Sequence, residues 1–158
     1  KGSFGHPVPV VDGKTQSAGA KAKAIVLKKE FTAERDLFSI DYTSAYSTPN
    51  LDKLIRTFVY DRQGEGNFTV SDEFTANVPI RFETAITTQA AWKVLDDTRL
   101  LLTSGTEQMI VNIEASGKVA FTSETIEVNA SAYTRIGIAL KEQAEKGYIW
   151  LKMQAKQL

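Results

Sequence analysis

The sequence predicts an all-β fold, an antiparallel two-sheet sandwich of the jelly-roll or supersandwich kind, and three observations carry this prediction. Apolar and polar residues alternate with a period of two in many short segments, which is typical of strands with one buried face. β-branched and aromatic residues are concentrated in these segments, and Gly, Asn, Asp and Ser separate them. So many short strands in 158 residues imply two sheets that bury their faces against each other. A single domain over residues 1–158 is long enough to form such a core without disulfides.

The strands are predicted in chain order from these patterns. They fall at residues 8–11, 21–29, 37–43, 54–61, 67–74, 80–86, 92–95, 99–104, 108–114, 118–122, 124–128, 133–140 and 147–154. A helix over residues 50–58 is the alternative to the strand at 54–61, because apolar side chains recur there at helical spacing. The run "IRTFVY" from Ile55 to Tyr60 favours the strand. Residues 141–146, KEQAEK, have helix-forming residues but are too few for a stable helix, so we expect a polar loop.

Glycine-containing pairs mark the predicted reversals of the chain. Asp12-Gly13 has the residue types of a two-residue hairpin turn, in which both residues take positive φ. Ser116-Gly117 is predicted to make the same kind of hairpin turn between the strands on either side of it. Ser104-Gly105 and the run from Gln63 to Gly66 mark two further reversals.

The strands at 54–61 and 67–74 are predicted to form a hairpin centred on Gly64, which fixes their register. The facing pairs are then Tyr60 with Phe68, Phe58 with Val70, and Arg56 with Asp72. This register places two charges on an aromatic face, where either charge alone would be costly to bury. Because opposed charges can satisfy each other, the sequence predicts an ion pair between Arg56 and Asp72.

The composition argues against several classes of partner and site. The chain has 19 Lys and Arg against 19 Asp and Glu, and this balance predicts no nucleic-acid partner and no membrane partner. No run of residues is long and apolar enough for a membrane-spanning helix. The absence of Cys excludes thiol nucleophiles, Cys-ligated zinc, iron–sulfur clusters and disulfides.

His6, in the stretch "GHPVPVVDGK", is the single histidine of the chain. It could be a metal ligand, a proton shuttle or an ordinary surface residue. A Ser-His-Asp triad is not expected, because the sequence has no Gly-x-Ser-x-Gly elbow. A carboxylate pair for glycoside hydrolysis is not expected either. Asp72 and Glu73 are neighbours on a strand and point to opposite faces, and Asp96-Asp97 is predicted to be a polar turn.

Two groups of side chains could contact an acidic glycan. The basic candidates are Lys21, Lys23, Lys28, Lys29, Arg56, Arg62 and Arg81. Charges along a solvated strand usually keep a protein soluble and protect a sheet edge, and we expect that role for them. Trp92 and Trp150 could stack on sugar rings, but their size favours places in the core.

Three segments of the first half carry a resemblance to a known family. In "GHPVPVVDGKTQSAG", the matching residues of a segment of the type His-Asn-x-Pro-x-Ile-Asn-Gly…Gln…Gly are His6, Pro9, Asp12-Gly13, Gln16 and Gly19. "DYTSAY" at 41–46 and "RTFVYDRQGEGNFTVSDEF" at 56–74 match further segments. The chain resembles the C-terminal β-domain of the heparinase II/III-like polysaccharide lyases.

The resemblance implies a longer parent protein. Enzymes of this family join an N-terminal α-helical toroid to a C-terminal β-sandwich, and they cleave uronic-acid-containing polysaccharides by β-elimination in the cleft between the two. Their catalytic Tyr and His residues come mostly from the toroid and from a His-rich strand that precedes the segment resembled here. We therefore expect the C-terminal fragment of a lyase, inactive alone and with no catalytic residues of its own.

The same resemblance gives the expected partners and location. The parent would act on an acidic polysaccharide, and the missing N-terminal α-toroid domain would be the partner of this domain. Lys1-Gly2-Ser3 lacks an initiator Met, as expected of a fragment or a processed chain. The parent is expected in the periplasm or at the cell surface of a bacterium.

The resemblance also assigns a role to His6. In some members a structural zinc is held by a His and an Asp from the preceding region and by a third His that opens a segment like this one, and His6 matches that third position. The family commonly has Asn after this His, whereas here Pro7 fixes φ and removes a backbone donor. Zinc takes three or four ligands, so we expect zinc only in the full-length parent and none in this fragment. In the fragment alone, His6 is expected to be a solvated residue at a frayed N-terminus.

A second hypothesis from a different class stays open. The chain could be a stand-alone carbohydrate-binding or adhesion module that holds sugar rings on Trp92 or Trp150. Loss of glycan binding after substitution of either Trp would favour this hypothesis.

Overall fold

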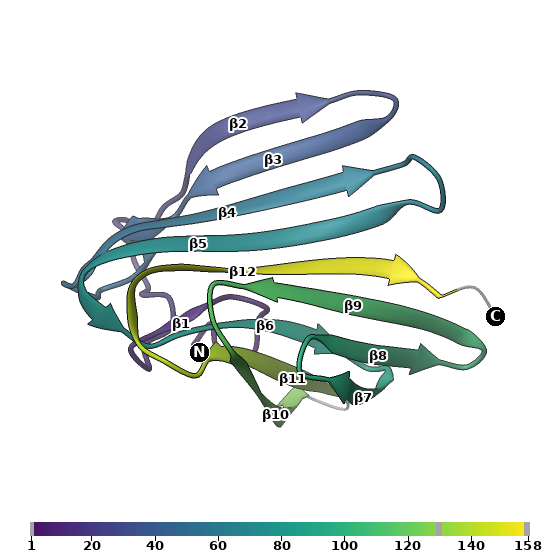
Figure 1. The fold of residues 1–158 in the computed structure, drawn as a ribbon. Coiled ribbons are helices and arrows are strands. Elements are labelled where there is room, and N and C mark those ends of the chain that lie inside the picture. The colour runs from purple at the N-terminus through teal and green to yellow at the C-terminus, as the bar shows by residue number, and fades with distance from the viewer. Residues whose placement is uncertain (1, 129–130, 157–158) are drawn as a thin grey trace.

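The computed structural model describes residues 2–128 and 131–156 and shows two antiparallel sheets packed face to face (Figure 1). The large sheet has 8 strands in the order β2-β3-β4-β5-β12-β9-β8-β7, and the small sheet has 4 in the order β1-β6-β11-β10. The one helical element of the described residues is η1, a 3-10 turn at Thr43–Ala45. Within those ranges, no helix has the length and apolar character needed to cross a bilayer. The predicted all-β two-sheet sandwich is confirmed.

The strand bounds place the elements along the chain. The large sheet contains β2 (Ile25–Phe31), β3 (Arg35–Asp41), β4 (Leu51–Asp61), β5 (Asn67–Ile80), β7 (Ala91–Asp96), β8 (Arg99–Ser104), β9 (Glu107–Ala115) and β12 (Ala144–Ala155). The small sheet contains β1 (Val10–Val11), β6 (Phe82–Thr88), β10 (Val119–Val128) and β11 (Ser131–Leu140).

Most predicted strands coincide with observed ones, and three expectations need correction. β4 begins at Leu51, so the alternative helix over residues 50–58 is wrong. The polar loop predicted at 141–146 is wrong in its second half, because β12 begins at Ala144, which pairs with Ile80. The two strands predicted at 118–122 and 124–128 form one continuous strand, β10.

The predicted hairpin register of β4 and β5 is confirmed at every proposed pair. The structure pairs Tyr60 with Phe68, Phe58 with Val70, and Arg56 with Asp72. Period-two alternation places these six side chains on the face of the large sheet that looks toward the small sheet, hereafter the inner face. The register therefore brings the two charges together inside the sandwich, as expected.

Three of the predicted turns are confirmed. Asp12 and Gly13 take φ values of 49° and 74°, and the residues on either side, Val11 and Lys14, form a bridge. Gly105 (φ 59°) lies in the turn between β8 and β9, and Gly64 and Gly66 both take positive φ between β4 and β5.

The hairpin predicted at Ser116-Gly117 is wrong. β9 and β10 belong to different sheets, and Gly117 is not among the residues with positive φ. Ser116 instead bonds to β12: its amide donates to Tyr148 O (3.0 Å) and its Oγ accepts from Tyr148 N (3.1 Å). The chain then crosses to β10 of the small sheet and does not fold back beside β9.

The core lies between the inner faces of the two sheets. Its completely or almost completely buried apolar members include Leu54, Leu100, Val111, Ile149 and Leu151 of the large sheet and Phe82, Ile136 and Ile138 of the small sheet. Burying such side chains supplies the main favourable contribution to folding, about 1.5–3 kcal/mol each. The two sheets are therefore held together chiefly by apolar packing.

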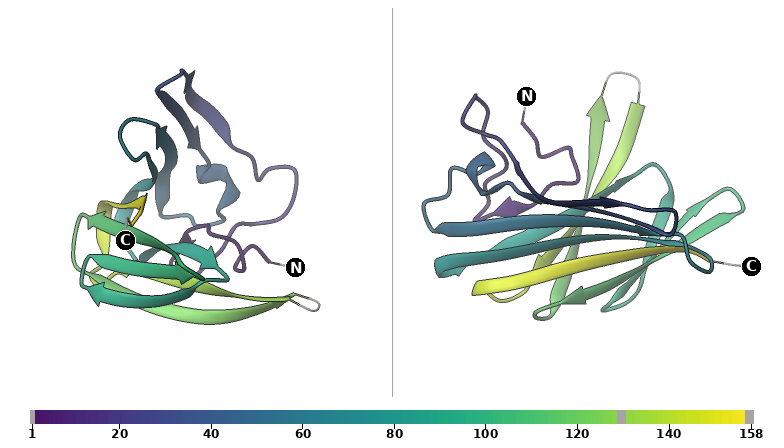
Figure 2. Two further views of the ribbon diagram at one scale, coloured as in Figure 1. Left: turned by 90° about the vertical axis from the view of Figure 1, so that its right-hand side faces the viewer. Right: turned by 90° about the horizontal axis from the view of Figure 1, so that it is seen from above.

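The small sheet covers only part of the large one. On the inner face of β4 the exposed fraction rises from 0% at Leu54 to 44% at Tyr60, and on β5 it rises from 3% at Phe74 to 37% at Phe68. β2 and β3 stand away from the small sheet in Figure 1 and in the left view of Figure 2. One end of the inner face is thus left without a covering layer.

Candidate functional site

His6, the predicted candidate ligand, lies in an N-terminal segment (residues 3–9) beside the end of β6. The side chain is exposed and borders a shallow pocket of about 340 Å³. The other residues that line the pocket are Gly5, Pro7, Thr87, Thr88, Gln89 and Tyr133. The imidazole is therefore open to solvent and has hydroxyl and amide groups around it.

The expectation that this segment is frayed is wrong, because four side chains, two from β11, one from β4 and one just after η1, hold its backbone carbonyls. The bonds are Tyr133 Oη to Gly5 O (2.7 Å), Arg56 Nη1 to Pro7 O (2.6 Å), Arg135 Nη2 to Val8 O (3.4 Å) and Tyr46 Oη to Pro9 O (2.8 Å). A Cβ at position 5 would lie 2.9 Å from Tyr133 Oη, so a larger residue than Gly5 would force one of the two to shift. The structure thus fixes the backbone on both sides of His6 and leaves its ring free.

Arg135 of β11 is the anchor of this segment on the small sheet. Its side chain is 2% exposed, donates to Glu83 Oε1 (2.6 Å) and lies over the Phe4 ring at 4.3 Å from the centroid. A guanidinium enclosed in this way needs a charge partner, and Glu83 on the neighbouring strand supplies it.

The anchor on the large sheet is the predicted Arg56–Asp72 ion pair, which is confirmed. Arg56 Nε and Nη2 donate to the two oxygens of Asp72 at 2.7 Å each. The side chains are 7% and 1% exposed. Two parallel bonds of this kind are the geometry in which guanidinium and carboxylate bind each other best.

Asp72 also accepts hydrogen bonds from two groups that the sequence did not indicate. Tyr42 Oη, just before η1, donates to Oδ1 (2.7 Å), and Thr84 Oγ1 of β6 donates to Oδ2 (2.6 Å). Each carboxylate oxygen therefore has two donors, which satisfies the buried charge. The resulting network, Arg56, Asp72, Tyr42 and Thr84, joins both sheets, the η1 region and, through Arg56, the N-terminal segment.

The environment keeps these groups in one protonation state. Burial raises the pKa of the Tyr42 hydroxyl well above its ordinary value, and the charge of Asp72 raises it further. Burial, and then Asp72, likewise raise the pKa of Tyr46. Burial acts to lower the pKa of Arg56, but the attraction of Asp72 outweighs it, so the pKa is raised. The two phenols remain donors and Arg56 remains charged, so none of them is available as a general base.

The described residues do not complete a zinc site around His6. They contain no group of three or more His, Asp or Glu residues arranged to hold a metal ion, and the pocket beside His6 has no carboxylate lining.

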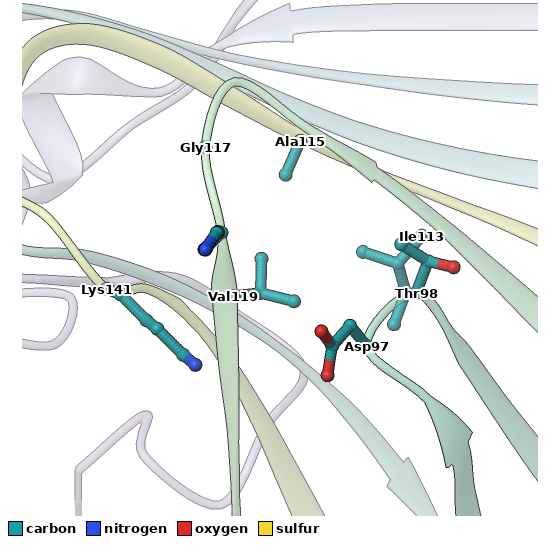
Figure 3. Close-up of a pocket in the computed structure, with 8 residues that line it drawn as sticks. Asp97, Thr98, Ile113, Ala115, Gly117, Val119 and Lys141 are labelled. Carbon is teal, nitrogen blue, oxygen red and sulfur yellow. The ribbon is translucent and has the colours of Figure 1, made fainter.

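A second hollow, of about 320 Å³, lies where the chain crosses from β9 to β10 (Figure 3). Asp97 and Lys141 border it from opposite sides, with the side chain of Val119 between them and that of Ile113 beside Thr98. No hydrogen bond or ion pair joins Asp97 to Lys141 in the described part of the chain. The hollow has charged groups at its rim, and its one hydroxyl group, that of Thr98, donates to Asp96 Oδ1 (3.0 Å).

The remaining predicted site residues lie at different places in the fold. Asp72 is buried and Glu73 is exposed on the other face, as predicted, and Asp96 and Asp97 lie at the β7–β8 turn, as predicted. The basic residues Lys21, Lys23, Lys28 and Lys29 are all exposed, and so is Arg81. The expectation of a solvated position is wrong for Arg56, which is buried and therefore cannot contact a glycan, and Arg62 pairs with Asp36.

The two tryptophans differ from each other. Trp92 packs against the core as expected, in a half-buried position. The expectation of a core position is wrong for Trp150, which is 38% exposed on the outer face of β12. The register explains this, because Ile149 and Leu151 on either side of Trp150 point into the core.

Comparison with solved structures identifies the architecture. The chain superposes on a crystal structure of heparinase III with a TM-score of 0.73 and 18% identity, over 96% of this chain and 23% of that one. It superposes on heparan sulfate lyase HepC from Pedobacter heparinus with a TM-score of 0.72 and 14% identity, over 97% of this chain and 24% of that one. The chain has the fold of a heparinase III domain.

The expected resemblance to the heparinase II/III-like lyases is thus confirmed at the level of the fold. The chain spans about a quarter of the length of the heparinase structures that it matches. No protein-family model and no curated protein matches the sequence.

We predict that Asp72→Asn lowers the free energy of unfolding by about 3–5 kcal/mol, because it leaves the Arg56 charge buried without a partner. Urea unfolding of the 158-residue chain measures this change. The matched control is Asp36→Asn, which also removes a carboxylate that pairs with an arginine of the large sheet but does so at the surface. Equal losses from the two variants would contradict the importance of the buried network.

Proposed function

We propose that this chain is the C-terminal β-sandwich domain of a polysaccharide lyase that cleaves uronic-acid-containing glycans by β-elimination. In the full-length protein the domain supports and shapes the cleft for an acidic polysaccharide and lacks a complete catalytic set. The observation that carries the proposal is the heparinase III fold of a chain whose single imidazole stands alone at the surface. By the same resemblance, we propose that the parent protein is bacterial and works in the periplasm or at the cell surface.

The chemistry of the reaction explains why the domain would need a partner. β-elimination requires a base for the proton α to the uronate carboxylate, a group that offsets the charge of the enolate, and an acid for the leaving oxygen. Tyr42, Tyr46 and Tyr133 all donate to oxygens within the fold. His6 could fill one of the three roles. The remaining groups would come from the other three quarters of the parent.

The proposal predicts that the parent protein releases unsaturated uronate product from an acidic polysaccharide and that the isolated 158-residue chain releases none. The rise in ultraviolet absorbance of the unsaturated product measures both activities, and circular dichroism checks that the isolated chain is folded. Product release by the folded isolated chain would contradict catalytic incompleteness. A parent that cleaves no uronate-containing polysaccharide would contradict the lyase assignment.

A second candidate function, a carbohydrate-binding module, is favoured by the exposed Trp150. The Trp150 and Tyr148 rings lie 5.1 Å apart on the outer face of β12, in the middle of the large sheet. Tyr148 Oη donates to Glu114 Oε1 (3.3 Å). A hollow of about 480 Å³ beside Tyr148 has the charged residues Lys53, Lys146 and Glu73 in its lining. Flat aromatic faces next to polar groups are suited to stack on sugar rings.

If the chain binds glycans in this way, Trp150→Ala should weaken the binding of heparan sulfate by about tenfold or more. Affinity electrophoresis of the 158-residue chain in gels that contain heparan sulfate measures the change. Tyr60→Ala is the matched control, because Tyr60 is an exposed aromatic residue on the opposite face of the same sheet. Unchanged mobility of the Trp150→Ala variant would reject glycan binding through Trp150.

A further inference from the structure

We propose that the uncovered end of the inner face is the surface on which the rest of the parent chain packs. This surface, hereafter the aromatic face, consists of Val26, Phe31, Phe38, Phe58, Tyr60 and Phe68 on strands β2 to β5. The inference rests on the proposed function to the extent that it requires a longer parent, and it assigns the domain contact to particular residues.

The exposure of the aromatic face is the first argument. Phe31 is 67% exposed, Val26 52%, Tyr60 44% and Phe68 37%. β2 adds further apolar exposure at Ile25 and Leu27, which are 60% and 48% exposed. Contiguous apolar surface of this kind on a soluble domain marks a site of contact with another protein surface.

The rings of the aromatic face are already ordered for contact. Phe38, Phe58 and Phe68 form a stacked row across three strands, with centroids 6.5 and 6.3 Å apart and interplanar angles of 24° and 21°. At the outer end, Arg62 lies over the Tyr60 ring at 4.8 Å and pairs with Asp36. A rigid apolar row with an ion pair at its rim has the pattern of an interface core with a polar border.

The aromatic face is continuous with the N-terminal segment. A cavity of about 230 Å³ is lined jointly by Pro7, Arg56, Phe58 and Phe68. Arg56 donates to Pro7 O, and its guanidinium carbon is 5.9 Å from the centroid of Phe58. Polypeptide that joins this segment would therefore lie beside the aromatic face from the start, which raises its effective concentration there.

Two other occupants suit the aromatic face less well. Edge pairing of β2 with a second copy is opposed by Lys28 and Lys29, exposed in the middle of the strand, and by the irregular pairing between Val26 and Lys28. An acidic glycan would need several cations, whereas the cations on and beside this face are Lys29, which lies opposite Phe38, and Arg62, which is paired with Asp36. The rest of a chain about four times as long is the occupant that matches a large apolar face.

Thiol labelling of the full-length parent tests this inference. The 158 residues contain no Cys, so Phe31→Cys and Val94→Cys each place a single thiol in the domain. Both residues are exposed apolar residues on edge strands at opposite ends of the large sheet, and Val94 is 45% exposed. We expect Phe31→Cys to react with iodoacetamide at least about tenfold more slowly than Val94→Cys, as followed by peptide mass spectrometry.

Equal labelling rates at the two positions would overturn the inference. Slow labelling of Phe31→Cys only in a dimer of the parent would instead show that a second copy covers the face. Slow labelling only after heparan sulfate is added would show that the glycan covers it, and either result would also overturn the inference. Val26→Cys gives a second reading if Phe31→Cys does not fold. Lyase activity of the unmodified parent is measured separately. Fast labelling in an active lyase would reject the docking surface alone, whereas slow labelling in a parent without lyase activity would reject the proposed function alone.

Discussion

The buried pair of Arg56 and Asp72 is the interaction on which the rest of the arrangement depends. Removing two charges from water costs several kcal/mol for each, and the cost is recovered only when geometry and hydrogen bonding are close to ideal. Here the carboxylate accepts four hydrogen bonds, from Nε and Nη2 of Arg56, from Tyr42 and from Thr84. Because these partners belong to both sheets and to the segment before η1, satisfying one carboxylate fixes the relative positions of all three.

The same pair connects the fold to the candidate site. The third donor group of Arg56 holds the carbonyl of Pro7, next to His6. The other side of the guanidinium lies near Phe58 in the stacked row of the aromatic face. The buried network thus positions the segment that carries His6 next to the aromatic face. This arrangement suits a domain that packs against another domain.

Much of the fold could be predicted from the sequence because its determinants are local. Alternation located the strands, and Gly64 between β4 and β5 fixed a register in which Arg56 had to face Asp72. The partners Tyr42 and Thr84 could not be predicted. They reach Asp72 from other elements, so the residues around Asp72 in the sequence do not indicate them. Ser116-Gly117 has turn chemistry but leads to the other sheet, since local residues do not say which sheet comes next. For Trp150, size favoured the core, yet the alternation of β12 placed it outside.

The central claim is that the Arg56–Asp72 network holds the N-terminal segment in place against the sandwich. Amide hydrogen exchange of the double variant Arg56→Met, Asp72→Leu tests it most directly, because this variant removes both charges and leaves apolar side chains of similar size in the core. We predict that the Val8 amide, which donates to His6 O, loses its protection while the amides of β8 and β9 keep theirs. Unchanged protection at Val8 in a folded double variant would contradict the claim.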